Sequence, residues 1–333
     1  MLGEVIDRLG NVSKISIFDD VEPNPKDTTV EKGLGLFKEK NCDSILGLGG
    51  GSPMDTAKAI AAMSTNPGKI NEYCGVGKLK NPAAPLLLIP TTAGTGSEVS
   101  RGAVITDSSR NYKMLILSWF LAPKVAILDP KLTVSLPPRT TAWTGVDALT
   151  HAMEAYVSTF ANPITDVFAL DAIRLISANL RKAVKNGKNL DARSNMLLGS
   201  LLAGVAMTNA LLGNVHALAH PVGGHFDTPH GLTCAVLLPV VMEFNLEAIP
   251  KKFANIAEAM GKEVKDLSEK EAARKAIEAV RELCVDLEVP ENLSELGVNK
   301  EAIPQMVKDA VILPSNPRET TKEDLAKLYE KAF

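Results

Sequence analysis

The stretch Ser44-Ile-Leu-Gly-Leu-Gly-Gly-Gly-Ser-Pro53, continued by Met-Asp-Thr-Ala-Lys-Ala-Ile60, decides the fold of the first half of the chain. It predicts a β-strand over Ser44–Leu48, a glycine loop, and a helix from Pro53 to about Met63. A second strand is predicted at Pro85–Ile89, so strand, helix and strand alternate. This βαβ order indicates a parallel sheet.

Further elements are expected on both sides of this unit. Upstream, the sequence predicts a strand at Lys14–Phe18 and a capping box at Thr28–Glu31, which begins a helix that ends near Lys40. Downstream, it predicts a hairpin of Val104–Thr106 with Tyr112–Leu117 around a turn at Asp107–Asn111, and then an apolar strand at Val125–Leu128.

The second half of the chain is expected to be helical. From Pro137 onward the strand signals almost vanish and helical periodicity takes over. Helical segments are predicted through Lys185, from Asn189 to His220 and from Asp266 to Leu287. We place a boundary near Leu136, which gives an α/β domain over residues 1–136 and an all-α domain over residues 137–333.

The composition favours a small molecule as the partner. The 333-residue chain has 36 Lys+Arg against 39 Asp+Glu and no basic block, which argues against nucleic acid or an anionic membrane. Its four cysteines form no CxxC pair, and Glu4 and Asp7 stand where a signal peptide would be apolar, so we expect a cytoplasmic protein. The uncharged stretch Ser194–Phe226 is long enough for a membrane span, but its polar residues favour a helix at the centre of the helical domain.

Two loops rich in glycine and hydroxyl groups follow the predicted strands. Gly47–Pro53 leads into a helix, whose free N–H groups and positive dipole end favour a phosphate; a tight turn is the alternative. Thr91–Glu98 follows the next strand, and ligands of open parallel sheets bind at the carboxyl ends of strands; a solvent loop is the alternative here. Together the loops predict a dinucleotide site. The motif is neither GxGxxG nor a P-loop, so the expected fold is Rossmann-like at most.

All five histidines fall in one part of the helical half, at His151, His216, His220, His225 and His230. Asp147 and His151 are four residues apart and therefore share a helix face, and His216 and His220 repeat this spacing. One carboxylate and three imidazoles form a sensible ligand set for Fe(II), Zn(II) or Ni(II). A hydrogen-bonded place in a helical core is the simpler interpretation of any single histidine, whereas the cluster favours a metal. Spacing alone does not tell which histidine is surplus.

Four motifs together resemble the iron-containing alcohol dehydrogenase family, in particular its group III metal-dependent members. They are GLGGGSPMDTAKAI (Gly47–Ile60), PTTAGTGSEVS (Pro90–Ser100), GVDALTHAMEAYVS (Gly145–Ser158) and HALAHPVGGHFDTPHG (His216–Gly231). The resemblance covers nearly the whole chain, including the tail Asn316–Phe333. It implies a dehydroquinate synthase-like architecture, in which a dinucleotide-binding α/β domain and an all-α metal domain face each other across a cleft.

The resemblance also implies roles for single residues. The implied metal ligands are Asp147, His151, His216 and His230, while His220 corresponds to a catalytic histidine beside the nicotinamide and His225 receives no role. The implied cofactor contacts are Gly49, Gly50, Gly51, Ser52, Asp55, Thr91, Thr92, Thr95 and Lys113. For Lys113, an exposed hairpin lysine is the alternative.

The implied activity is metal-dependent hydride transfer between NAD(P)(H) and a short-chain primary alcohol, a diol or the corresponding aldehyde. Fe(II) is the implied metal, with Zn(II) as a substitute; NAD(H) is favoured over NADP(H), and a homodimer is expected. Two alternatives stay open, a zinc-dependent glycerol-type polyol dehydrogenase and a truncated, non-catalytic metal-binding remnant. The second arises because family members usually begin with a further strand and loop, without which the sheet would lack its usual first strand and have an exposed edge.

Overall fold

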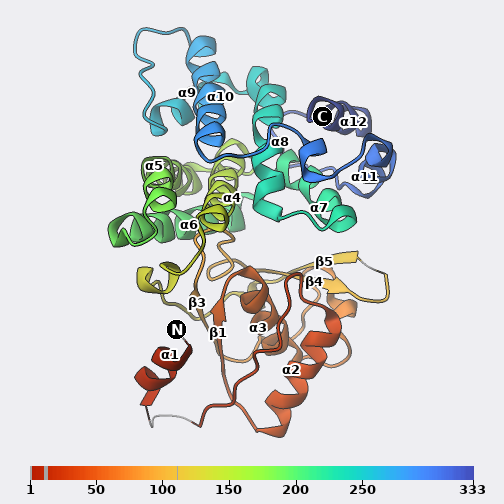
Figure 1. Cartoon of the computed structure of the whole chain (residues 1–333). Coiled ribbons are helices and arrows are strands. Elements are labelled where there is room, and N and C mark those ends of the chain that lie inside the picture. The colour runs from red at the N-terminus through yellow and green to blue at the C-terminus, as the bar shows by residue number, and fades with distance from the viewer. Residues whose placement is uncertain (1, 11–13, 111) are drawn as a thin grey trace. The chain divides into compact units, whose positions relative to one another are not determined.

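The chain divides into two compact units in a computed structural model that describes residues 2–10, 14–110 and 112–333 (Figure 1). The first unit comprises Met1–Thr92 and Ser97–Thr133, and it holds the strands of the structure. The second comprises Ala93–Gly96 and Val134–Phe333 and is helical. The short segment Ala93–Gly96 therefore belongs to the helical unit, although it is flanked in sequence by the α/β unit.

A parallel three-stranded sheet confirms the prediction from the βαβ pattern. Its strands are β1 (Ile45–Gly49), β3 (Leu86–Pro90) and β6 (Val125–Ala126), in the order β1-β3-β6. β1 and β3 pair from Ile45↔Leu86 to Gly49↔Pro90, and α3 (Gly51–Met63) follows β1 directly. Within the described residues β1 is an edge strand of this sheet.

A second small sheet contains the predicted hairpin. Strands β4 (Gly102–Asp107) and β5 (Tyr112–Leu117) are antiparallel, and β2 (Gly75–Val76) pairs parallel with β5. Alternate hairpin side chains, among them Ile105 and Met114, are fully buried against α2 and α3. The expected turn between the two strands includes Asn111, which lies outside the described residues.

Two predictions for the first unit are wrong. Lys14–Phe18 is not a strand: Ile15 and Ile17 are exposed and only Phe18 packs against the core. An alternating pattern shows which side chains suit a core, but it does not provide a neighbouring strand to pair with. Helix α2 (Asp27–Glu39) confirms the predicted helix, but the capping box at Thr28–Glu31 does not form, because the N-cap residue is Lys26 and no side chain caps the helix. Ahead of both segments lies α1 (Leu2–Leu9).

The second unit is all-helical beyond Thr133, as predicted. Its helices are α4 (Pro138–Val157), α5 (Pro163–Lys185), α6 (Leu190–Ala210), α7 (Asn214–Phe226), α8 (His230–Asn245), α9 (Pro250–Ala259), α10 (Glu269–Asp286), α11 (Ile303–Asp309) and α12 (Lys322–Lys331). The predicted helical segment Asn189–His220 is two helices rather than one. Leu211 has a φ of 67°, which ends α6, and α7 leaves at an angle of 102°.

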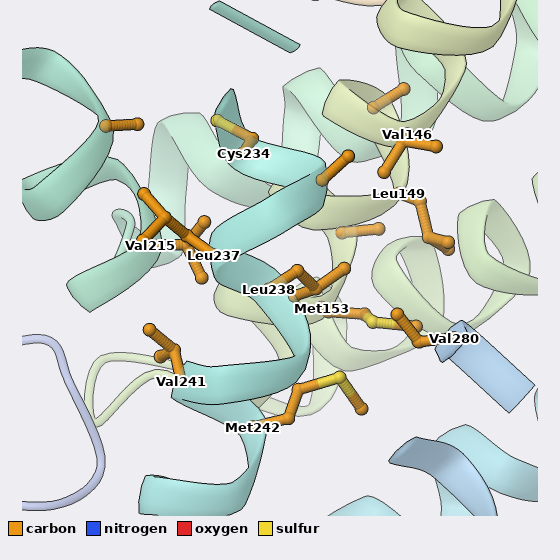
Figure 2. Close-up of a cluster of buried hydrophobic side chains, with 14 of the residues drawn as sticks. Val146, Leu149, Met153, Val215, Cys234, Leu237, Leu238, Val241, Met242 and Val280 are labelled. Atoms are coloured by element: carbon orange, nitrogen blue, oxygen red, sulfur yellow. The ribbon is translucent and has the colours of Figure 1, made fainter. Parts of the chain in front are cut away.

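The apolar helices of this unit form its core. Figure 2 shows Val146 and Leu149 of α4 packing near Leu237 and Leu238 of α8, and all four are buried. By length and composition alone, His230–Ala248 is long enough to cross a membrane, and the bent pair α6 and α7 passes the same test. However, 67% of the apolar window in His230–Ala248 is buried inside the protein. Packing in the helical core therefore accounts for this hydrophobicity.

Candidate metal centre and nucleotide loop

Helix α4 places the first two candidate ligands side by side. Asp147 and His151 lie one helical turn apart, both buried, with His151 Nε2 3.8 Å from Asp147 Oδ1. The other ring nitrogen of His151, Nδ1, lies 3.3 Å from the carbonyl oxygen of Gly94. A hydrogen bond from Nδ1 to that carbonyl leaves the Nε2 lone pair directed toward the carboxylate.

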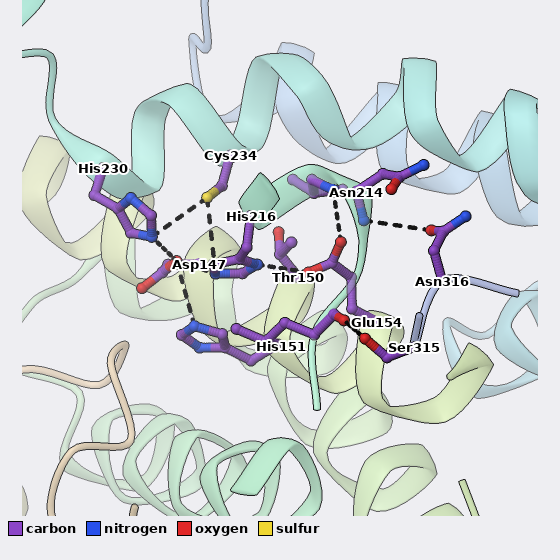
Figure 3. A network of polar contacts seen from close by, with 12 residues as sticks. Asp147, Thr150, His151, Glu154, Asn214, His216, His230, Cys234, Ser315 and Asn316 are labelled. Carbon is purple, nitrogen blue, oxygen red and sulfur yellow. Dashed lines mark hydrogen bonds and ion pairs between the residues drawn. The ribbon is translucent and has the colours of Figure 1, made fainter. Parts of the chain in front are cut away.

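Helices α7 and α8 bring two more imidazoles to the same carboxylate (Figure 3). His216 Nε2 lies 3.7 Å and His230 Nε2 3.6 Å from Asp147 Oδ1. The approach of α8 to α4 depends on Gly231, because a Cβ atom there would lie 2.2 Å from the carbonyl oxygen of Trp143. The structure thus brings together all four residues that the family resemblance implies as ligands.

A buried glutamate on α4 orients His216, and sequence reasoning missed it. Glu154 Oε2 lies 2.5 Å from His216 Nδ1, while Glu154 Oε1 accepts a hydrogen bond from the Val215 amide at 2.7 Å. This carboxylate–histidine contact is the usual support of a metal-binding imidazole. The available signal was spacing, since Glu154 stands seven residues, or two helical turns, after Asp147.

The tail of the chain holds the start of α7. Asn316 Oδ1 accepts a hydrogen bond from the Asn214 amide at 3.3 Å, and the side chain of Asn214 donates to Thr320 Oγ1 at 2.9 Å. Asn245 of α8 also donates to Asn316 Oδ1, at 3.0 Å. The segment around Asn316 therefore ties together the two helices that carry His216 and His230.

The electrostatics of the cluster suit a cation. Burial alone would raise the pKa of Asp147, but the neighbouring His151, His216 and His230 hold it well below its usual value, so the carboxylate is ionised. Within the described part of the chain, its buried Oδ1 accepts no hydrogen bond. A buried carboxylate oxygen left without a donor among imidazoles fits a divalent metal ion, which would satisfy it.

A cysteine that we did not predict also reaches this cluster. Cys234 Sγ lies 3.7 Å from His230 Nε2 and 4.0 Å from His216 Nε2. One donor atom from each of Asp147, His216, His230 and Cys234 forms a set within 4.8 Å of one another. Burial raises the pKa of Cys234 to about 11, so the metal-free protein holds a neutral thiol. Its spacing of four residues from His230 was the available signal.

The two remaining histidines lie apart from the donor set. The His220 ring is exposed and stacks on the His230 ring, with 5.5 Å between the centroids. His225 is exposed as well, and its Nε2 lies 2.8 Å from an oxygen of Asp309. The structure therefore places His220 beside the cluster and His225 in a surface ion pair.

The two loops predicted to form a dinucleotide site meet at the carboxyl ends of β1 and β3. The Thr91 amide donates to the Gly49 carbonyl oxygen at 2.9 Å, and a Cβ atom on Gly50 would lie 3.3 Å from Thr92 Cγ2. The buried Thr92 Oγ1 has no hydrogen-bond partner among the described residues. Gly50 is the N-cap of α3 without a side-chain hydrogen bond, so the first turn, which includes Gly51 and Ser52, is open to an anion.

The other predicted cofactor contacts are distributed differently. Asp55 accepts hydrogen bonds from Ser97 Oγ at 2.6 Å and from the Val104 amide at 2.9 Å, so it fixes the loop to β4. Lys113 on β5 donates to Asn24 Oδ1 at 2.9 Å, and Thr95 lies in the segment that belongs to the helical unit.

Sequence reasoning did not single out two buried ionisable groups near this loop. The ammonium of Lys58 is fully buried and donates to the carbonyl oxygens of Ser100 and Gly102 at 2.9 and 2.8 Å. Burial lowers the pKa of Lys58 to about 8 and raises that of Glu98 to about 7. The lysine therefore ties α3 to the start of β4.

Comparisons with known proteins agree with this geometry. Family models described as "Iron-containing alcohol dehydrogenase" and "Fe-containing alcohol dehydrogenase family, C-terminal" match residues 1–130 and 141–333. The chain is 49% identical over 324 residues to a 1,3-propanediol dehydrogenase of Klebsiella pneumoniae, covering 96% of this chain and 84% of the relative. It is 44% identical over 322 residues to an NAD-dependent methanol dehydrogenase of Bacillus methanolicus, with the same two coverages.

The solved structures show the same likeness. A crystal structure of 1,3-propanediol oxidoreductase matches 100% of this chain and 88% of its own, with a TM-score of 0.97 and 46% identity. These findings do not favour either alternative, the glycerol-type polyol dehydrogenase or the non-catalytic remnant. Since the family models span both halves and the relatives exceed 40% identity, the chain belongs to the iron-containing alcohol dehydrogenase family and is an oxidoreductase of alcohols or aldehydes.

Proposed function

We propose that this enzyme transfers hydride between NAD(H) and a short-chain primary alcohol, a diol or the corresponding aldehyde, with a divalent metal ion bound in its helical unit. The observation that carries the proposal is the buried, unsatisfied Oδ1 of Asp147 with three imidazole nitrogens 3.6–3.8 Å away. The substrate range follows from the relatives, which are named for 1,3-propanediol and for methanol.

The proposed metal ligands are Asp147, His151, His216 and His230, with Fe(II) as the metal and Zn(II) as a substitute. When bound, the metal supplies Lewis-acid polarisation of the substrate oxygen. Glu154 fixes the His216 ring so that Nε2 faces Asp147, and the carbonyl of Gly94 does the same for His151. The donor geometry is therefore set before any ligand arrives.

The proposed dinucleotide site lies at the glycine loop. Gly49, Gly50, Gly51 and Ser52 would hold the diphosphate at the start of α3, where a side chain at Gly50 would intrude toward Thr92. Thr91 and Thr92 would contact the adenosine half, and Asp55 would keep the loop in place. Thr95 and Lys113 are proposed as further cofactor contacts. We favour NAD(H) over NADP(H), in line with the NAD-dependent relative.

His220 is proposed as the group that moves the proton. Its exposed ring stacks on His230, so it lies next to the metal cluster while it can exchange a proton with solvent. A histidine in this position would give or take the hydroxyl proton of the substrate without binding the metal.

We also propose that the working form is a homodimer in the cytoplasm. The four cysteines are free, as expected in a reducing compartment. In domain terms, residues 1–136 would bind the dinucleotide and residues 137–333 the metal. Light scattering of the purified protein measures the oligomeric state directly.

The test is an anaerobic assay of the Fe(II)-reconstituted chain, which follows NADH consumption with a short aldehyde. We expect turnover that a chelator abolishes and added Fe(II) restores. Asp147→Asn should show no turnover, because it lacks the ionised oxygen. His225→Ala serves as the matched control, since His225 lies in a surface ion pair. Absence of turnover in a chain that carries one metal ion would overturn the proposal.

A further inference from the structure

We propose that Cys234 contributes its sulfur to the metal centre as an additional ligand, next to Asp147, His216 and His230. The inference rests on the proposed metal centre and goes beyond it, because no sulfur belongs to the ligand set that the family resemblance implies.

The spacing of the donor atoms is that of a single coordination sphere. Zinc-to-nitrogen and zinc-to-sulfur bonds of about 2.0–2.3 Å place tetrahedral donors roughly 3.3–3.7 Å apart. Cys234 Sγ lies 3.7 Å from His230 Nε2 and 4.0 Å from His216 Nε2, and each of these nitrogens lies within 3.7 Å of Asp147 Oδ1. These four distances exceed the tetrahedral values by at most a few tenths of an ångström, and every pair within the set lies within 4.8 Å, so a modest contraction would bring the donors onto one ion.

The cysteine stands on the opposite flank of the cluster from His151. His151 belongs to α4 and contacts Asp147 and the carbonyl of Gly94, whereas Cys234 lies one turn into α8 from His230. The compact set of donors within 4.8 Å of one another contains Cys234. Figure 3 shows its sulfur directed toward the two imidazoles, at the edge of the apolar core to which the cysteine also belongs.

A second observation points independently to a ligand here. Asp147 is only 3% exposed, yet its Oδ1 has no hydrogen-bond donor among the described residues. Cys234 is fully buried and forms no disulfide. A buried thiol that only filled space would face apolar atoms. This thiol, at the edge of the apolar core, also lies within 4.8 Å of a buried, unsatisfied carboxylate oxygen, and a metal ion between them would serve both groups.

Sulfur coordination has consequences for the choice of metal. A thiolate is a soft ligand and favours Zn(II) over Fe(II) more strongly than an oxygen or nitrogen donor does. An ion bound at this position would replace the thiol proton, because a coordinating cysteine is deprotonated. A centre that includes Cys234 is therefore expected to favour Zn(II) over Fe(II) more strongly than a centre of one carboxylate and three imidazoles.

X-ray absorption of the zinc-loaded full chain tests the inference without relying on activity. We expect one sulfur at about 2.3 Å beside nitrogen and oxygen neighbours at about 2.0–2.2 Å. Cys234→Ser should lose the sulfur neighbour and bind zinc at least tenfold more weakly. Cys284→Ser is the matched control, since Cys284 lies on α10 and its thiol faces the carbonyl of Ala235.

The outcomes separate the two proposals. Bound zinc with nitrogen and oxygen neighbours alone overturns the role of Cys234 and leaves the proposed function standing. A wild-type chain that binds no metal overturns both. Because the decisive spectrum is that of the wild-type protein, the test does not depend on the folding of a variant. A sulfur neighbour that persists in Cys234→Ser would also refute the assignment.

Discussion

Replacing Glu154 by glutamine should weaken metal binding without removing any ligand. In the wild type, His216 Nδ1 donates to Glu154 Oε2 across 2.5 Å, so Nε2 is the nitrogen that faces Asp147 and that would bind a metal ion in place of its proton. In Glu154→Gln, the amide oxygen is expected to keep the hydrogen bond from Val215 and to turn its NH₂ group toward His216. The imidazole would then accept at Nδ1 and carry its proton at Nε2, in the position where the metal binds.

The expected loss is one to two orders of magnitude in affinity. A hydrogen bond to a charged group contributes about 1.5–3 kcal/mol, and supporting residues of metal-bound histidines contribute roughly 10–100-fold. Both routes give the same range, since about 1.4 kcal/mol corresponds to a factor of ten in affinity. Both oxygens of Glu154 are engaged and the side chain is buried, so water is not expected to take over its role.

Competition with a chromophoric chelator measures the zinc affinity of both proteins. Glu247→Gln is the control, because Glu247 is exposed and pairs only with the surface residue Lys270. Circular dichroism of the metal-free proteins checks that the helices are intact. An affinity of Glu154→Gln within threefold of the wild type would show that the carboxylate does not set the tautomer of His216, and the reasoning would then be wrong.

Three further predictions concern other residues. His220→Ala should lower turnover by about 10²–10⁴-fold at unchanged metal content; loss of metal would make His220 a ligand. Gly50→Val should weaken NAD(H) binding at least tenfold by calorimetry at unchanged metal content, because the valine side chain would fill the space beside Thr92. An unchanged affinity would mean that the phosphates bind elsewhere. Glu98 has its pKa raised by burial from 4.5 to about 7, so the folded state retains a proton that the unfolded state loses, and stability falls across this window as the pH rises. Glu98→Gln should therefore gain stability over the wild type between these pH values in urea unfolding, and a pH-independent difference would contradict this.

Local patterns predicted most of the fold, and the failures have non-local causes. The strand, glycine loop and helix of Ser44–Met63 could be predicted because residues within this stretch mark where each element begins and ends. A strand at Lys14–Phe18 would need a partner, and alternation of side chains does not say whether one is there. The break at Leu211 escaped because a leucine with a left-handed backbone leaves no mark in a helical hydrophobic pattern.

The residues of the candidate metal centre also fall into those that a local pattern predicts and those that only tertiary packing brings together. The pairing of Asp147 with His151 follows from helix geometry alone. The same rule would pair His216 with His220, whereas His216 faces α4 and only the resemblance to the family assigned it correctly to Asp147. Glu154 and Cys234 were missed because attention to histidine overlooks a carboxylate and a thiol that tertiary packing brings to the same point.

The hydrogen bonds that Asn316 and Thr320 accept from Asn214, at the start of α7, imply an order of events during synthesis of the chain. Asp147 and His216 leave the ribosome long before the residues that hold α7 in position, and Asn316 also anchors α8 through Asn245. A nascent chain interrupted before Asn316 would contain the imidazoles but lack the hydrogen bonds that hold α7 and α8 together. Loading of the proposed metal ion is therefore expected to be a late, post-translational step, in which the ion reaches a chain whose α7 and α8 are already held together.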